Sequence, residues 1–327
     1  EFAEKPQCIN PKAGFVATAN DAPVEPNFPH HLSLDFMGGF RGQRIRQLLA
    51  DKQLWSAEDF RILQLDITSL PARRFVRAVT SMVPAGSLGA LEQKMLELLS
   101  TWDGEMSATS AAASCYQVVM LSICRIGLLP QMGEAAYKVW MGAPTSPLAI
   151  LGQFGGRYTG PIVQALENQE PWLLPEGLAD YQTLLACAFT AAAQELKQLL
   201  GPDPTQWAWG KLHTIQLAHP LGVVPALGPW LNGPTLPFQG DTDTICQSVV
   251  VPHDPYKTKC WAPSFRMVAE VGGSSRSVLP GGVSGLPHDR HYLSQFSAWH
   301  KGQLLDDYFD RAQLERLKPD RLYLNPL

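Results

Sequence analysis

The sequence lacks the short motifs by which several large enzyme classes are recognised. Its 327 residues contain no GxSxG nucleophile elbow, no HExxH zinc motif, no Walker phosphate-binding loop and no GxGxxG fingerprint after a strand. Each absence removes the usual sequence evidence for one chemistry: serine hydrolysis at an elbow, zinc-dependent proteolysis, nucleotide hydrolysis or hydride transfer. The chemistry of this chain must be sought in residues that no such motif marks.

The sequence also has little charge and no excess of positive charge. Charged residues make up 17% of the chain, the formal net charge is -4, and there is no basic run. Neither nucleic acid nor an anionic membrane surface is therefore an expected partner. We expect no membrane span, because the longest apolar stretch, near residues 184–193, is interrupted by polar groups. The first residues lack the basic start and apolar stretch of a signal peptide. Because a Pro-rich loop leads directly into a predicted strand, we expect them to be internal to a longer protein.

Metal-ligand and redox motifs are absent as well. Six cysteines and eight histidines are present, but the sequence has no CxxC pair and no zinc-ligand spacing. Adjacent histidines, His30 and His31, point to opposite sides of an extended chain, so no metal site is predicted. Three cysteines lie in helical apolar patterns and are expected to be buried thiols: Cys115, Cys124 and Cys187. Cys246 and Cys260 flank a predicted hairpin loop and would pair only in an oxidising compartment, which the sequence does not identify.

Helical and strand-like patterns occupy different parts of the chain. From about residue 41 to 200 the apolar spacing is helical; a capping box is predicted at Ser56, and the longest helix should stop at Gly201. Residues 1–40 and 201–327 are expected to be mainly strands and loops. Strands are predicted over these segments: 14–18, 244–251, 264–271, 276–279 and 321–324. The predicted fold class is α+β, with a mainly helical insertion between the first strand and the later strands.

The segment from Pro11 to Arg46 carries the strongest chemical signal. Its short β-type run delivers Asn20 and Asp21 into a turn bounded by proline, and a Gly-Gly break precedes Arg41 at the start of a helix. An amide at the end of a strand, with a guanidinium beside it, can bind a developing oxyanion. Asn-Asp before Ala-Pro is also good turn chemistry, so a purely structural role for Asn20 stays open. No residue before Asn20 has the character of a nucleophile.

Several segments match, in order, the motifs of one enzyme family. INPKAGFVATANDAP resembles NPxxGxIxTANNxP, GGFRGQRIRQLL resembles GxRxxRI, and LQLDITSLPA resembles QxDxxSxxA. LLSTWDGEMSATSAAA resembles LxxWDGxMxxxSxA, and SFRMVAEVG with VLPGGVSGLPHDRHYLSQFSAW resembles SxRxVxD followed by PGGxSGxPxSPHYxDQxxxW. These are motifs of the penicillin acylase family of N-terminal nucleophile hydrolases. The resemblance runs from the first ten residues to the last thirty.

The resemblance implies an amidohydrolase that works through an acyl-enzyme. In the family, an N-terminal serine exposed by autoproteolysis attacks the amide and uses its own α-amino group as the base. By position, Asn20 matches the asparagine that donates its side-chain N–H to the oxyanion, and Arg41 matches the arginine that supports it. The implied fold is the αββα fold of N-terminal nucleophile hydrolases. The implied substrates are N-acyl compounds such as penicillins or acyl-homoserine lactones, and family members are commonly periplasmic or secreted.

The chain departs from the family pattern in ways that limit what it can do alone. Because Glu1 is not a nucleophile, the chain resembles only the C-terminal part of the large subunit, and it is expected to be inactive by itself. Its expected partners are the missing small subunit and the N-terminal part of the large subunit. Asp21 replaces the second Asn of the TANN motif. Some members bind calcium through a carboxylate between the Asn and the Arg, but Asp35, the acid close to that place, is out of register, so no cofactor or metal is predicted.

Other interpretations stay open. The parent protein could be a non-catalytic relative that binds acyl compounds, or this region could be an assembly module. The residue at the N-terminus of the missing segment would separate these from an enzyme. A further interpretation is a free-standing α+β ligand-binding domain unrelated to the family, which predicts that the TAND turn faces solvent and that Arg41 lies far from Asn20. If strands are shared with missing segments, exposed strand edges and apolar faces should be present.

Overall fold

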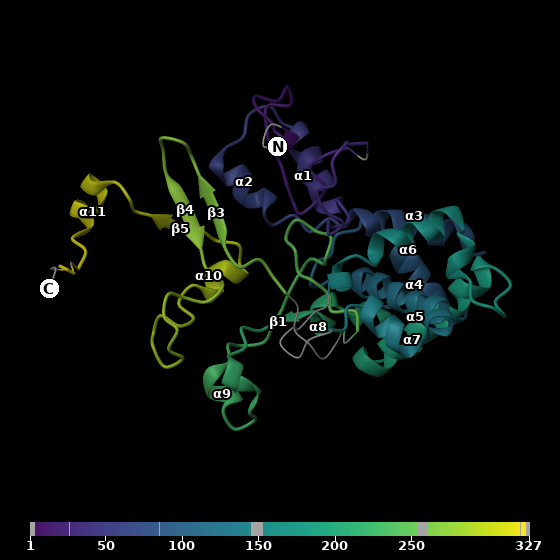
Figure 1. Ribbon diagram of the computed structural model, residues 1–327. Helices are drawn as coiled ribbons and strands as arrows, with labels where there is room; N and C mark the ends of the chain where they lie inside the picture. The colour runs from purple at the N-terminus through teal and green to yellow at the C-terminus, as the bar shows by residue number, and fades with distance from the viewer. Residues whose placement is uncertain are drawn as a thin grey trace. The chain divides into compact units, whose positions relative to one another are not determined.

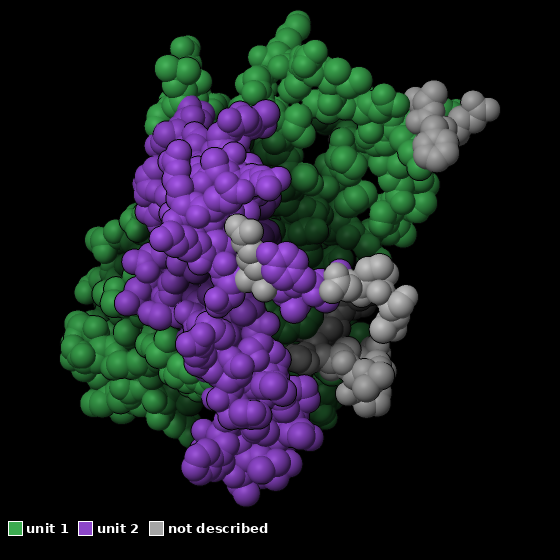
Figure 2. Space-filling view, turned by 90° about the vertical axis from the view of Figure 1, so that its left-hand side faces the viewer, with its two compact units in different colours: residues 1–54, 65–217, 233–262 green, residues 55–64, 218–232, 263–327 purple. Residues whose placement is uncertain are grey.

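The computed structural model describes residues 4–25, 27–84, 86–144, 153–253, 255, 261–320 and 322–324. The chain forms two compact units, each built from separate stretches of sequence (Figures 1 and 2). Unit 1 comprises residues 1–54, 65–217 and 233–262, and unit 2 comprises residues 55–64, 218–232 and 263–327. Helices and antiparallel sheet are both present, in agreement with the predicted mixture of the two.

Unit 1 is built around a bundle of helices that lie side by side (Figure 1). The bundle consists of α3 (Leu70–Met82), α4 (Ala90–Ser100), α5 (Ala111–Trp140), α6 (Thr159–Asn168) and α7 (Tyr181–Leu200). Their apolar faces meet in one core that includes Phe75, Val118 and Phe189, all fully buried. Burying side chains of this size stabilises the fold by about 1.5–3 kcal/mol each. As predicted, α7 ends at Gly201, whose φ of 93° stops the helix.

The exposure of the cysteines tests the prediction that three of them are buried thiols on helices. Cys115 and Cys124 are fully buried in the core on α5, as predicted. The expectation for Cys187 is wrong, because this residue is exposed. It lies on α7 next to the buried Ala188, and the neighbours that pack into the core occupy the opposite face of the helix. Cys260 lies outside the described residues, so the predicted pairing with Cys246 lies there too.

Helix α5 corrects the expectation that no apolar stretch is long enough to span a membrane. By length and composition alone it could cross one, since an 18-residue window has a mean hydropathy of 1.6. However, 78% of that window is buried inside the protein, as in the core helix of a globular bundle. Polar residues that interrupt the apolar pattern, such as Ser114, Gln117 and Ser122, are themselves buried. The helix is kinked at Gly133, where φ is 74° and ψ is 161°, shortly after Pro130.

After α7, unit 1 continues into a short helix and a small ladder. Helix α8 (Trp209–Leu212) precedes β1 (Thr214–Ile215), which pairs antiparallel with β2 (Leu236–Pro237). Trp209 is buried and its indole N–H donates to the carbonyl of Gly240 at 3.0 Å. This hydrogen bond ties α8 to the turn that follows β2.

The strand predicted over residues 244–251 is wrong. Those residues form a turn with one isolated bridge, between Val249 and Trp261. Side chains take the backbone hydrogen bonds that a ladder would use: the Asp241 N–H donates to Thr244 Oγ1 at 3.0 Å, and Thr244 Oγ1 donates to the Cys246 carbonyl at 2.9 Å. Most β-branched side chains of the segment are therefore buried, although the segment forms no ladder with a second strand in the described part of the chain.

Unit 2 contains a three-stranded antiparallel sheet in the order β3-β4-β5 (Figure 1). The strands are β3 (Arg266–Ala269), β4 (Ser275–Val278) and β5 (Leu305–Asp307). The first two confirm the strands predicted over residues 264–271 and 276–279. Residues 322–324, the described part of the last predicted strand, form no strand, so that prediction is wrong for them.

Short helices accompany this sheet in unit 2. They are α2 (Ala57–Leu63), α9 (Gly228–Leu231), α10 (Phe296–His300) and α11 (Arg311–Leu317). The predicted capping box of α2 is confirmed: Ser56 Oγ accepts from the Asp59 N–H at 3.2 Å, and the Ser56 N–H donates to Asp59 Oδ2 at 2.8 Å. At the other end of α2, Gln64 Nε2 donates to the Met267 carbonyl at 2.8 Å and so ties the helix to β3.

The N-terminal segment of unit 1 corrects the prediction of a first strand. Residues 14–18 form no strand, although burial alternates along them as in extended chain. Backbone N–H and C=O groups of a strand need a neighbouring strand, and none pairs with these residues in the described part of the chain. Val16, in the middle of the segment, is 66% exposed. The helical region therefore does not follow a strand but an extended arm that leads to α1 (Phe40–Ala50).

Candidate functional site

Helix α1 places two arginines beside the turn that contains Asn20. Gly39 precedes the helix with φ 78°, in the left-handed region, which lets the chain turn sharply into the first helical residue. That residue, Phe40, is buried and fixes the start of the helix. Arg41 and Arg46 follow on the same helix, so their side chains start from one rigid element.

The turn residue Asn20 has a left-handed backbone conformation, with φ 64°. Asparagine tolerates this region better than most other residues, because its short amide can bond locally. The Asn20 carbonyl accepts from the Met37 N–H at 2.8 Å, which joins the turn to the chain just before α1. Its side chain is exposed. The turn therefore presents an amide to solvent from a constrained backbone.

Arg41 fixes the orientation of this amide. The Nη2 atom of Arg41 donates to Asn20 Oδ1 at 2.9 Å. Since a guanidinium can only donate, the atom that faces it must be the amide oxygen. The Nδ2 atom of Asn20 is consequently the end directed away from Arg41. The structure thus brings together both predicted site residues and directs the donor end of the amide away from Arg41.

Asp21 attaches the same turn to α1. Its Oδ1 accepts from the Ala19 N–H at 2.9 Å, and its Oδ2 accepts from Arg46 Nη2 at 2.8 Å. Burial raises the pKa of Asp21, but these hydrogen bonds and the charge of Arg46 outweigh it and hold the pKa below the usual value. The carboxylate also lies against Gly42, where a β-carbon would come within 2.7 Å of Asp21 Cγ. The turn and the helix are therefore packed together without room for a side chain at that position.

A pair of carboxylates lies in the core of unit 1 near Arg41. Asp241 and Asp243 are buried, and Asp241 Oδ1 accepts from the Asp243 N–H at 2.7 Å. Burial raises the pKa of both groups, and the charge of Asp241 raises that of Asp243 further. Burial lowers the pKa of Arg41, while the charges of Asp243 and Asp21 oppose that shift. Burial therefore favours the protonated form of this pair, and only the ionised form of Asp243 stabilises the Arg41 cation that contacts Asn20.

Sequence reasoning missed three members of this group: Asp21, Arg46 and Asp243. Asp21 was visible only as a departure from the TANN motif, although an acid there opposite a second arginine on the helix was a usable signal. Asp243 lies in the sequence GDTDT, immediately before the segment that was predicted to be a strand. The two closely spaced acids were the only sequence signal for this residue.

Asp35 is the acid that the sequence places close to the calcium-binding position of some family members. Asp35 is exposed, with 65% of its side chain accessible, and its nearest charged partner is Arg157, whose Nη2 lies 3.7 Å from Oδ1. The part of the chain that the structure describes contains no group of three or more His, Cys, Asp or Glu side chains that could hold a metal ion.

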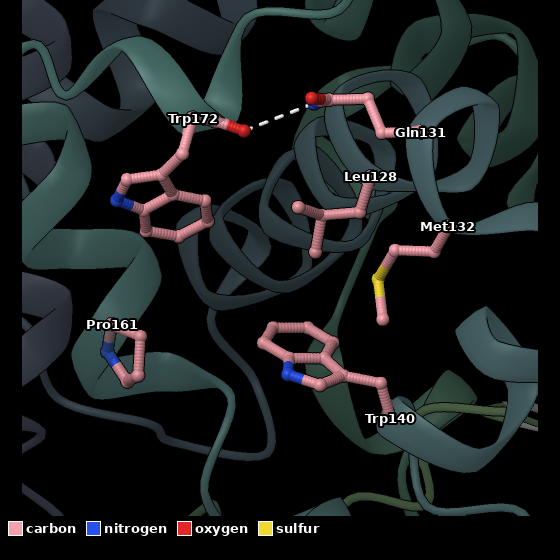
Figure 3. Close-up of a pocket in the computed structure, with 6 residues that line it drawn as sticks. All are labelled: Leu128, Gln131, Met132, Trp140, Pro161 and Trp172. Carbon is pink, nitrogen blue, oxygen red and sulfur yellow. Dashed lines mark hydrogen bonds between the residues drawn. The ribbon is translucent and has the colours of Figure 1, made fainter.

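A separate apolar pocket of about 310 Å³ lies in unit 1 (Figure 3). It is lined by Leu128, Gln131, Met132, Trp140, Pro161 and Trp172. Gln131 Nε2 donates to the Trp172 carbonyl at 3.0 Å, and the two indole rings face the pocket from α5 and from the segment after α6. No acid, base or nucleophile is among these lining residues, so the pocket has no chemistry of its own.

Comparison with known proteins identifies a family that matches this chain. The family model described as penicillin amidase matches residues 1–316. The penicillin acylase 2 proenzyme of Pseudomonas sp. (strain SE83) is 29% identical over 90% of this chain and 36% of its own length. The acyl-homoserine lactone acylase QuiP of Pseudomonas aeruginosa is 25% identical over 98% of this chain and 40% of its own length. The chain thus spans about two-fifths of the length of these relatives.

A solved structure agrees at the level of the fold. The thermostable penicillin G acylase from Alcaligenes faecalis superposes with a TM-score of 0.57, covering 97% of this chain and 58% of that chain at 16% identity. The interpretation as a free-standing domain unrelated to any acylase is wrong, both because of these matches and because Arg41 contacts Asn20. The match over nearly all its length means that the chain belongs to the penicillin amidase family.

Proposed function

We propose that the protein of which this chain is a part hydrolyses the amide bond of an N-acyl compound, of the penicillin or acyl-homoserine lactone type. Asn20 stabilises the oxyanion through its Nδ2–H, and Arg41 holds Asn20 in the orientation that this requires. The observation that carries the proposal is the 2.9 Å hydrogen bond from Arg41 Nη2 to Asn20 Oδ1, which directs the donor end of an exposed asparagine away from Arg41.

The proposed reaction has two stages. A nucleophilic hydroxyl on a segment outside this chain attacks the acyl carbonyl carbon, and its proton passes to the α-amino group of the same residue. The carbonyl oxygen becomes an oxyanion that accepts from Asn20 Nδ2. Collapse of the tetrahedral intermediate breaks the C–N bond and the amine leaves with the proton. Water then attacks the acyl-enzyme carbonyl, its proton passes to the same α-amino group, and the oxyanion again accepts from Asn20 Nδ2. Collapse of this second intermediate breaks the C–O bond to the enzyme, returns the proton to the hydroxyl and releases the acid.

The nucleophile and the acyl pocket are proposed to come from a small subunit and from the N-terminal part of the large subunit. The lengths of the relatives support this, and one of them is named a proenzyme. Exposed apolar side chains in unit 2 also support it, because they offer surface to a partner: Met267 is 51%, Phe309 66% and Val283 72% exposed. We propose that the sheet of unit 2 contributes to an αββα arrangement in the complete protein, and that this chain alone is inactive.

The test is hydrolysis of a chromogenic acyl amide by the complete protein and by this chain. Asn20→Ala should lower kcat on the order of 10²–10³-fold and leave KM nearly unchanged, since an oxyanion donor acts in the transition state. Asn10→Ala is the matched control, because Asn10 is another exposed asparagine with a left-handed backbone, φ 48°. It should leave kcat unchanged.

Two results would refute parts of the proposal. Retention of wild-type kcat by Asn20→Ala would exclude Asn20 as the oxyanion donor. Hydrolysis by this chain alone would show that the nucleophile is not supplied from outside it. A complete protein that binds acyl compounds without hydrolysing them, and whose large subunit does not begin with Ser, Thr or Cys, would instead be a non-catalytic binder.

A further inference from the structure

We propose that Asp21 is a positioning residue for the oxyanion site: its carboxylate locks the backbone of Asn20 and fixes the distance between Asn20 and Arg41. This inference rests on the proposed function of Asn20. It concerns the residue at which the chain departs from the TANN motif, where the motif has a second asparagine.

The first of the two contacts of the Asp21 carboxylate spans Asn20. Asp21 Oδ1 accepts from the N–H of Ala19, so the hydrogen bond joins the residues on either side of Asn20 at 2.9 Å. Such a ring restricts the backbone of the residue that it encloses, here in the left-handed region at φ 64°. Rotation of the Asn20 backbone would have to break this bond.

The second contact joins the turn to α1. Asp21 Oδ2 accepts from Arg46 Nη2 at 2.8 Å, and only 10% of the Asp21 side chain is exposed. Gly42 lies directly against the carboxylate, with no β-carbon between the helix and the turn. Because Arg41 and Arg46 lie on the same helix, fixing Asp21 to Arg46 also fixes Asn20 relative to Arg41. An asparagine at position 21 has one acceptor oxygen and no charge, so it cannot make both contacts with equal strength.

Protonation of Asp21 at acid pH should weaken both contacts, with the Ala19 N–H and with Arg46. The charged groups that face this carboxylate are Arg46 and Arg41, both on α1, and Arg41 also faces Asp243. The pKa of Asp21 lies below the ordinary value of 3.8. The contacts are therefore complete above that value and are lost as the pH falls through the lowered pKa.

The first experiment uses nuclear magnetic resonance on this chain labelled with ¹⁵N-asparagine. The side-chain amide signal of Asn20, assigned by its absence in Asn20→Ala, should shift with a midpoint below pH 3.8 in the wild type. In Asp21→Asn the signal should be displaced at neutral pH and should not follow that titration. Asp203→Asn is the matched control: Asp203 also accepts from a backbone N–H and a hydroxyl in a turn, both of Thr205, and its loss should leave the Asn20 signal unchanged.

The second experiment measures kcat and KM in the complete protein. Asp21→Asn should lower kcat on the order of 10-fold with little change in KM, because a small displacement of a donor weakens transition-state contacts selectively. In an Asn20→Ala background the same substitution should have no further effect. Arg46→Gln should reproduce the kcat loss of Asp21→Asn, and the double variant should be no worse than either single variant.

The two experiments separate the inference from the function on which it rests. An Asn20 signal that is identical in wild type and Asp21→Asn, at neutral and acid pH, overturns the positioning role whatever the activity. A kcat loss of equal size in the Asn20→Ala background also overturns it, since Asp21 would then act independently of Asn20. A shifted Asn20 signal with unchanged kcat in both Asp21→Asn and Asn20→Ala refutes the proposed function and leaves the structural lock intact.

Discussion

Replacement of Gly42 by alanine tests the packing of α1 against the Asn20 turn. Within an ordinary helix this substitution stabilises a protein by about 0.5–1 kcal/mol, because alanine loses less backbone entropy on folding. Here the new β-carbon would lie 2.7 Å from Asp21 Cγ and 2.8 Å from Oδ1, and closer still to Oδ2. Non-bonded heavy atoms of this kind settle near about 3.5 Å, so the carboxylate must move.

The expected cost follows from the two contacts that the carboxylate would lose. The hydrogen bond from the Ala19 N–H to a charged acceptor contributes about 1.5–3 kcal/mol. The contact with Arg46 contributes less, about 0.5–1 kcal/mol, because 47% of the arginine side chain is exposed. Subtracting the gain in helix propensity leaves a net destabilisation of about 1–3.5 kcal/mol.

Urea unfolding followed by circular dichroism at 222 nm measures this change, because unit 1 holds most of the helix. The decisive comparison is the same substitution in an Asp21→Ala background, where the three nearest atoms are absent. There Gly42→Ala should become stabilising. If Gly42→Ala stabilises the chain that retains Asp21, or destabilises both backgrounds equally, the proposed contact does not control this position.

Other predictions concern groups away from the turn. His213 is buried, stacks on Trp209 and bonds Ser248, and burial lowers its pKa from 6.5 to about 3. The unfolded chain takes up this proton near pH 6.5 and the folded chain does not, so the free energy of unfolding should fall from about pH 6.5 toward 3, by at most about 1.4 kcal/mol per pH unit. His213→Gln should remove that component in pH-dependent urea unfolding; an unaltered slope would contradict the assignment. Ser56→Ala removes the capping box of α2 and should reduce hydrogen-exchange protection in that helix by about 1 kcal/mol; undiminished protection would show that the box is not formed in solution. A thiol reagent should modify the exposed Cys8 and Cys187 in the native chain but reach Cys115 and Cys124 only after unfolding, since burial raises the pKa of both buried thiols. Mass spectrometry identifies the sites, and native labelling of Cys124 would contradict the packing of α5.

Local signals in the sequence predicted local structure well. The capping box at Ser56 and the glycine stop at Gly201 depend on neighbours within a few residues, and both are confirmed. The motif resemblance located Asn20 and Arg41, and the structure places them in contact. Their roles in the reaction stay a prediction, because the contact defines where the two side chains lie and does not measure an effect on kcat.

Predictions that depended on distant partners failed. The run at residues 14–18 has strand composition but no neighbour to pair with among the described residues, and residues 244–251 satisfy their backbone through side-chain hydroxyls. Cys187 fell on the outer face of α7 because an apolar pattern does not by itself give the helix phase. The role of Asp21 was missed as well, since its ion pair with Arg46 spans 25 residues and forms only where the helix passes close to the turn.

The short sequence separations within the Asn20 turn bear on when the site forms during folding. Its contacts join residues 2, 21 and 25 positions apart, so little loop-closure entropy must be overcome before they form. Contacts of this kind form early and without long-range topology. The amide that is proposed to receive the oxyanion would then be oriented while the chain is still being assembled, before any segment that carries a nucleophile docks beside it. The segment that carries the nucleophile would then dock against a turn that is already formed, because the contacts that hold this turn all lie between Ala19 and Arg46.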